Sequence, residues 1–197
     1  MSKAVFCIAK TQTQAEAIVD QLKMAGFSYD DISVLFPDKQ GSKDFAHEHH
    51  TKAPEGAAAG AGAGGVVGGT LGLLAGIGSL AIPGVGPFIA AGPIMGALAG
   101  LGAGAATGGI IGALSQQAGI SDDEAHVYAE GLRRGGALVS VKVDDEDASR
   151  IQSIMDRSSV KIADRGAAYR KSGWESYNAS AKPLTPDEVV RERSLYR

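Results

Sequence analysis

An uncharged, glycine-rich segment constrains the fold of this chain more than any other feature. Between Glu55 and Asp122 the sequence contains no Asp, Glu, Lys, Arg or His. Within this segment, glycines recur at every fourth position in two series that are centred on Gly84. The first series comprises Gly56, Gly60, Gly64, Gly68, Gly72 and Gly76, and the second comprises Gly92, Gly96, Gly100, Gly104, Gly108 and Gly112.

A period of four places each glycine series along one stripe of a helix, where the absence of side chains lets another backbone approach closely. The residues between the two series, Pro83, Gly84, Gly86 and Pro87, are typical of a tight turn. We therefore expect residues 56–119 to form an apolar helical hairpin whose glycine stripes are helix-packing surfaces. Pro93 offers an alternative start for the second helix, since proline is favoured in a first helical turn.

Two environments suit such a hairpin. Each arm has about 25 residues, or roughly 37 Å as a helix, and a bilayer core needs about 20 residues. Lysines precede the hairpin and Arg133 and Arg134 follow it, which predicts that both ends stay on the cytoplasmic side of the inner membrane. Glycine and alanine are only weakly hydrophobic, however, so the core of a soluble homo-oligomer is the alternative environment for the arms.

The flanking sequence predicts an α/β domain. Apolar runs at residues 4–9 and 32–36 are typical of strands, and between them a helix with Thr13 as its cap carries an apolar stripe. After the hairpin, Ser121 caps a second helix, residues 137–143 alternate as a strand, Asp145 opens a third helix, and residues 160–163 form a last strand. The order β-α-β, insertion, α-β-α-β favours an α+β, ferredoxin-like sheet with helices on one face.

The predicted domain is discontinuous, comprising residues 1–37 and 120–164. Residues 38–55 are polar and indicate a linker, and residues 165–197 form a tail with a short helix that starts at Thr185. The net charge of −3 at pH 7 argues against a nucleic-acid partner. The N-terminal apolar run is too short for a signal peptide, and the single cysteine, Cys7, fits a reducing compartment, so we expect a cytoplasmic protein.

Candidate sites for chemistry are sparse. His47, His49 and His50 are candidate metal ligands, but they cluster on the linker without the set of about four ligands that a stable site needs, so solvated side chains or a pH-sensitive hinge are alternatives. Cys7 lacks a basic neighbour and is expected to be a buried structural thiol. The glycines lack the Gly-Lys-Ser/Thr ending of a phosphate loop. We expect no cofactor, no metal and no catalytic residues.

The tail interleaves aromatic and basic side chains, such as Tyr169, Arg170, Trp174 and Tyr177. This pattern suits docking on an anionic membrane surface or on the acidic body of a neighbouring subunit. The alternative is a tail that covers its own domain.

Three stretches of the sequence resemble one family. Residues 45–57 are similar to the start of the glycine-rich segment in bacterial heat-induced, general-stress-protein-like domains, residues 80–94 to the hairpin tip of that family, and residues 125–141 to its following helix and strand. The resemblance covers roughly residues 3–164. It implies a stress-associated, non-enzymatic protein and carries no catalytic residues.

The sequence therefore leads to two functional hypotheses. In the first, the glycine-zipper hairpin mediates membrane association and self-assembly. In the second, the hairpin is buried in the core of a soluble structural or partner-binding homo-oligomer. An enzyme is disfavoured because no nucleophile–base pair or metal constellation is visible.

Overall fold

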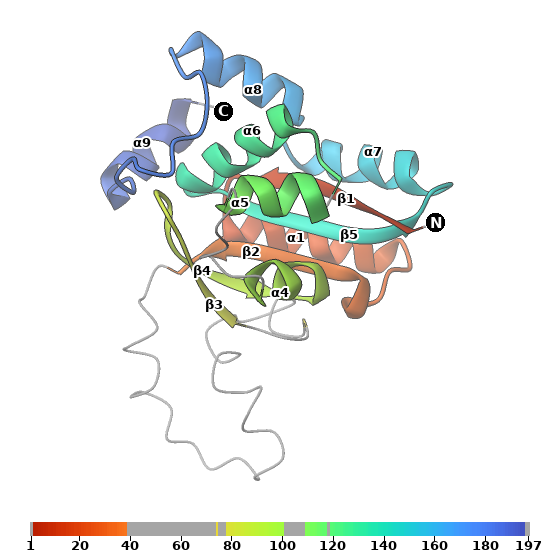
Figure 1. The fold of residues 1–197 in the computed structure, drawn as a ribbon. Helices are drawn as coiled ribbons and strands as arrows, with labels where there is room; N and C mark the ends of the chain where they lie inside the picture. Colours follow the sequence, from red (N-terminus) through yellow and green to blue (C-terminus); the bar gives the residue numbers. More distant parts are fainter. Residues whose placement is uncertain (1, 39–73, 75–77, 101–108, 118, 196–197) are drawn as a thin grey trace.

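A computed structural model describes residues 2–38, 74, 78–100, 109–117 and 119–195. The chain forms an α+β domain in which helices pack on a curled, five-stranded antiparallel sheet (Figure 1). The strands are β1 (Ser2–Ala9), β2 (Ile32–Pro37), β3 (Gly78–Ile82), β4 (Gly86–Ala91) and β5 (Ala137–Asp144). The helices include α1 (Gln12–Met24), α4 (Pro93–Gly100), α5 (Gly109–Gly112), α6 (Asp122–Arg133), α7 (Ala148–Ser158), α8 (Ile162–Lys171) and α9 (Pro186–Leu195).

The strand order in the sheet is β1-β5-β2-β4-β3, and every neighbouring pair is antiparallel. Strand β5 therefore lies between β1 and β2, which run parallel to each other and are joined by α1. Val141 of β5 is paired with Val5 on one side and with Ile32 on the other. Although β5 follows β1 by more than a hundred residues in the sequence, it is the middle strand of the group formed by β1, β5 and β2.

The first face of the sheet is covered by α1 and α7 (Figure 1). The apolar stripes predicted for these helices are confirmed, since Ile18 and Leu22 of α1 and Ile151 and Met155 of α7 are buried. They pack on Val139, Val141 and Val143 of β5, which alternate along one face of the strand. The cap of α1 is Thr11, whose hydroxyl accepts from the Gln14 amide at 3.1 Å, so the prediction of Thr13 was wrong by one half-turn.

The opposite face is covered as well, by α4, α5 and α6, so the prediction of helices on one face only was wrong. The stripe of α6 was predicted from its periodicity, and its Tyr128 and Leu132 are buried against this face. The apolar side chains on this face of the sheet need a cover, and residues from the insertion supply part of it. Ser140, which the alternation of β5 assigns to this second face, is consequently fully buried.

The middle of the insertion is a β-hairpin, and the helical prediction was wrong for residues 78–91. Strands β3 and β4 pair with each other, and β4 also pairs with β2, so their backbone groups are bonded within the sheet. This pairing avoids the cost of about 1 kcal/mol that each glycine adds in a helix interior. The predicted turn is confirmed, because Gly84 and Gly86 have φ values of 74° and 114°. The second helix begins at Pro93, which is the alternative start.

The predicted strand at residues 160–163 was also wrong, because Ile162 begins α8. Residues 165, 166 and 169 of α8 are buried, and α8 packs on α6, so this segment adds a helix to the domain instead of a strand to the sheet. The caps predicted at Ser121 and Thr185 are confirmed, since their hydroxyls accept from the Glu124 and Glu188 amides, both at 3.4 Å. Within the described ranges, no helix combines the length and the apolar character that crossing a bilayer requires.

Candidate functional site

Most of the predicted helix-packing glycines lie outside the described residues. These are Gly56, Gly60, Gly64, Gly68, Gly72, Gly76, Gly104 and Gly108. Of the others, Gly96 and Gly100 lie in α4 and Gly112 ends α5. Gly92 has a different role, since its φ is 90° and a Cβ there would overlap the Ile32 carbonyl oxygen and lie 2.6 Å from Ser33 Cα. Gly92 is therefore required by close packing of the α4 entry on β2 of the same chain.

The predicted turn residues meet the tail. The hydroxyl of Tyr177 donates to the Pro83 carbonyl, and a Cβ on Gly84 would lie 2.7 Å from the Ala179 carbonyl oxygen. Pro87 lies in β4, and its carbonyl accepts from the Asp38 amide at 3.0 Å. Burial raises the pKa of Tyr177 to about 12. The tail segment thus packs on the β3–β4 turn of its own chain, which is the alternative in which the tail covers its own domain.

The candidate metal ligands His47, His49 and His50 lie outside the described residues. Across the residues that the structure describes, no three His, Cys, Asp or Glu side chains gather as metal ligands would. Nδ1 of His126 accepts from the Tyr177 amide at 3.2 Å, so this imidazole has a structural contact. Cys7 is buried between the sheet and its helices, and burial raises the pKa of its thiol to about 12. A thiol of that kind is a poor nucleophile at neutral pH, as expected for a structural cysteine.

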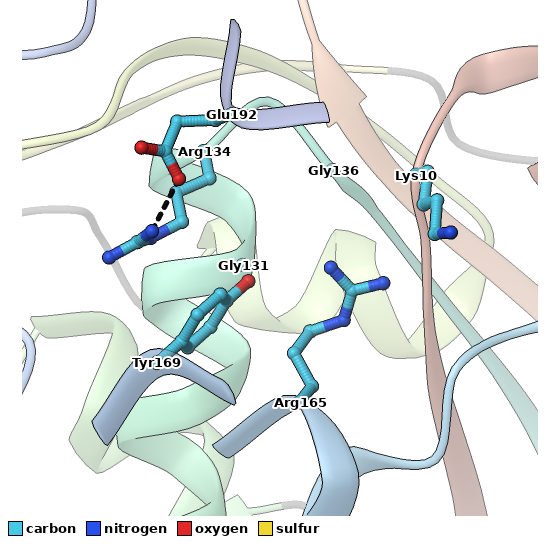
Figure 2. A pocket seen from close by; sticks show the side chains of 7 residues that line it. All are labelled: Lys10, Gly131, Arg134, Gly136, Arg165, Tyr169 and Glu192. Carbon is cyan, nitrogen blue, oxygen red and sulfur yellow. Dashed lines mark hydrogen bonds and ion pairs between the residues drawn. The ribbon is translucent and has the colours of Figure 1, made fainter. Parts of the chain in front are cut away.

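A small pocket with a basic lining lies where α6, α8 and α9 meet the end of β1 (Figure 2). It has a volume of about 20 Å³, enough for roughly one water molecule. Its lining comprises Lys10, Gly131, Arg134, Gly136, Arg165, Tyr169 and Glu192. Three of these side chains are cationic and one is a carboxylate, so the lining carries an excess of two positive charges.

Glu130 organises the α6 side of this pocket. Its side chain is 1% exposed and is bound by Arg133 Nε at 3.0 Å and by Arg134 Nε at 2.8 Å. Arg134 also forms an ion pair with Glu192 of α9, and its guanidinium lies 4.3 Å from the centre of the Tyr169 ring. These contacts hold Arg134 in a fixed position at the C-terminal end of α6, where a cation also suits the helix dipole.

Arg165 is the least satisfied group of the pocket. It is 7% exposed, and its Nε and Nη2 atoms have no hydrogen-bond partner. Figure 2 shows its guanidinium pointing into the space between Tyr169 and Lys10. Burial raises the pKa of Tyr169, and the positive charge of Arg165 partly offsets that effect.

Sequence reasoning missed this pocket because residues 165–169 were assigned to a tail. The spacing of Arg165 and Tyr169 by four residues is compatible with one helix face. The other walls of the pocket, however, come from residues of α6 and α9, which are distant in the sequence.

A second, larger cavity of about 400 Å³ lies beside β1, the outer strand of the sheet. It is lined by Phe6, Gly119, Ile120, Glu124, Tyr128, Gln152, Asp156, Lys161, Ile162 and Ala163. The Phe6 carbonyl accepts from the Tyr128 hydroxyl at 3.1 Å, so a side chain satisfies the backbone group at this edge. Its volume falls in the range of small-molecule sites, but its charged groups have mixed signs and do not define a ligand.

Comparison with known proteins shows no match to a family model, to a curated protein or to a solved structure.

Proposed function

We propose that this chain is a non-enzymatic assembly module in which the glycine-rich segments around residues 56–76 and 96–112 mediate self-association. The observation that carries the proposal is the uninterrupted absence of charge and histidine from residues 56–121, combined with glycines at every fourth position. Two such segments can bring backbones close enough for extensive van der Waals contact. Gly92 is excluded from this interface because it packs on Ser33 of its own chain.

The α+β domain supports the proposal because part of the insertion is folded into the domain. Residues 78–100 contribute strands β3 and β4 and helix α4 to the folded body. The part of the chain that contains the first glycine-rich segment follows Pro37, the last residue of β2, and precedes Gly78, the first residue of β3. A ferredoxin-like fold of this domain is part of the proposal, supported by the position of β5 between β1 and β2, which α1 connects. The stress-associated role implied by the family resemblance belongs to it as well.

Membrane association at the cytoplasmic side of the inner membrane is the second candidate function. The same lack of charge favours it, since no charged group would enter the hydrocarbon. Against deep insertion of the tip, residues 78–91 form sheet hydrogen bonds and Tyr177 bonds the turn. Self-association is therefore the preferred function, and a lipid surface is the alternative site of assembly.

The test is the mass of the full chain in solution, measured by light scattering after size exclusion, with and without added liposomes. We expect a homo-oligomer without lipid. The variants Gly68→Leu and Gly104→Leu place bulk on the two stripes and should reduce the mass toward that of a monomer. The matched controls Gly69→Leu and Gly102→Leu add the same bulk outside the series and should leave the oligomer intact.

A monomer of the wild-type chain in both conditions would refute the proposal. Equal effects of the stripe variants and their controls would show that the four-residue register is not an interface. A monomer in solution that oligomerises only on liposomes would favour the membrane alternative instead.

A further inference from the structure

The segment between α8 and α9 is attached to the domain through a single buried residue. It passes beside the turn between β3 and β4 (Figure 1). Of residues 175–183, only Tyr177 is buried. Within the described part of the chain, the two hydrogen bonds that join this segment to the rest of the protein both involve Tyr177. Docking of the segment therefore depends on how firmly Tyr177 is held.

Tyr177 is held through its side chain and through its backbone. Its hydroxyl donates to the Pro83 carbonyl in the β3–β4 turn, and its amide donates to Nδ1 of His126 at 3.2 Å. Two residues later, the Ala179 carbonyl oxygen lies so close to the turn that a Cβ on Gly84 would approach it to 2.7 Å. The segment thus lies directly on the turn of the uncharged insertion.

The docked segment covers apolar side chains of that turn. Ile82 and Val85 are 4% and 8% exposed, and they belong to the same core cluster as Tyr177. Both residues lie within residues 56–121, which carry no charge and no histidine. Loss of Tyr177 from this cluster would expose an apolar surface at the turn.

The hydrogen bond to His126 exists only while the imidazole is neutral. Because the Tyr177 amide donates, Nδ1 must present a lone pair, and the ring proton is on Nε2. In an imidazolium both ring nitrogens are donors, so a protonated Nδ1 would place its own N–H against that of Tyr177. Histidine side chains gain a proton between about pH 8 and pH 5. Acidification over this range therefore removes one of the two bonds that hold the segment.

The charged groups around His126 offer little to replace that bond. The insertion contributes none, and α8 packs on another side of α6, where Gly166 approaches Val127. The charged residues of the remaining elements are Asp122, Asp123, Glu124, Glu130 and Arg133 of α6, Glu175 and Lys182 of the segment, and Glu188 in the first turn of α9. Glu130 is bound by two arginines, and the other carboxylates are exposed, where ion pairs are weak. Only an attraction to Glu175 would oppose release of the segment.

We propose that His126 is a pH-sensitive latch, which holds residues 175–183 on the β3–β4 turn when neutral and releases them when protonated. The docked segment excludes a proton from Nδ1, so docking is favoured at high pH and weakens as the pH falls. Since one proton is taken up per release, the equilibrium constant for opening rises by at most about tenfold per pH unit. This control of access to the insertion goes beyond self-association, because it operates on the turn and not on the glycine series.

The test is nuclear magnetic resonance of the full chain at pH 8 and at pH 5. At pH 8, nuclear Overhauser contacts should join the Tyr177 ring to residues of the β3–β4 turn, and at pH 5 they should be lost. The protection factor of the Tyr177 amide, which corrects for the intrinsic pH dependence of exchange, should fall by at least about tenfold. Amides of β5 should stay protected at both pH values, because only the segment opens.

The decisive variant is His126→Asn. The side-chain oxygen of asparagine can accept near the position of Nδ1 but does not titrate, so this variant should keep the segment docked at pH 5. The matched control is the triple variant His47→Asn/His49→Asn/His50→Asn, which leaves His126 as the only histidine of the chain. It should release the segment as the wild type does, and it still tests the latch if His126→Asn fails to fold.

Two results would overturn the proposal. Contacts between the Tyr177 ring and the turn that persist at pH 5 in the wild type would show that the Tyr177 side chain suffices to hold the segment. Equal release in the wild type and in His126→Asn would show that a group other than His126 controls docking.

Discussion

Replacement of Gly92 by alanine tests whether the insertion is packed on the sheet as described. The backbone at Gly92 has a φ of 90°, which costs an L-residue roughly 1–2 kcal/mol. The added Cβ would lie 2.6 Å from both Cα and Oγ of Ser33, whereas real Cβ atoms essentially never come within 3.0 Å of another atom. Since β2 is held on both sides by β4 and β5, it cannot move away, and the overlap costs roughly 1–3 kcal/mol more. The sum predicts a loss of about 2–5 kcal/mol.

The assay is urea denaturation followed by circular dichroism, with Gly26→Ala as the matched control. Gly26 has a φ of 99°, but a Cβ there meets no atom within 4 Å, so only the backbone cost of roughly 1–2 kcal/mol applies. Gly92→Ala should therefore lose clearly more free energy of unfolding than Gly26→Ala. Equal losses in the two variants would refute the close approach of α4 to β2. Gly92 would then remain a candidate for the predicted helix-packing surface.

Two further predictions concern buried polar groups. Ser33→Ala should lower the free energy of unfolding by about 1–3 kcal/mol, because Ser33 Oγ accepts from the Ile94 amide at 2.9 Å and its loss leaves that donor unsatisfied. Ser140 is the residue of β5 that is paired with Ser33, and Ser140→Ala should be neutral or stabilising because Ser140 Oγ is buried without a partner. A larger loss at Ser140 than at Ser33 would contradict this assignment. Because burial raises the pKa of Cys7 from 9.0 and that of Tyr177 from 10.0, both to about 12, the folded chain holds these protons more tightly than the unfolded chain, so stability should be constant up to about pH 9 and fall toward about pH 12. Denaturation midpoints measured across that range should fall less steeply in Cys7→Ala and in Tyr177→Phe, and an unchanged slope in both would show that these groups are not buried.

The periodic helices could be predicted from sequence because each buries one apolar face, with residues at helical spacing, against a neighbouring layer. Ile18 and Leu22 of α1 are buried where a period of 3.6 places them, and the same holds for Tyr128 and Leu132 of α6. Ser121 was recognised as a cap since its partner Glu124 lies three residues away. All these features depend on local spacing, which the sequence displays directly.

The glycine series misled the prediction over residues 78–91 for a physical reason. A four-residue period is necessary for a packing stripe on a helix, but glycine also permits turns with positive φ and close backbone approach. The turn at Gly84 was recognisable from composition, whereas the choice between helical arms and strands depended on the edge of β2, which offers hydrogen bonds to β4. A partner strand of that kind is not visible in the local sequence.

The sequence by itself determined that an uncharged, glycine-rich segment interrupts an α+β domain, where the turn of that segment lies, and which faces of the periodic helices are buried. Only the tertiary structure decided that part of the segment joins the sheet and that Arg165, Arg134 and Glu192 share one pocket. Periodicity and capping are governed by neighbours within four residues along the chain. The pocket instead depends on how α6, α8 and α9 pack in space. Arg165 becomes buried only when these helices pack together, and burial is what makes its positive charge costly in free energy.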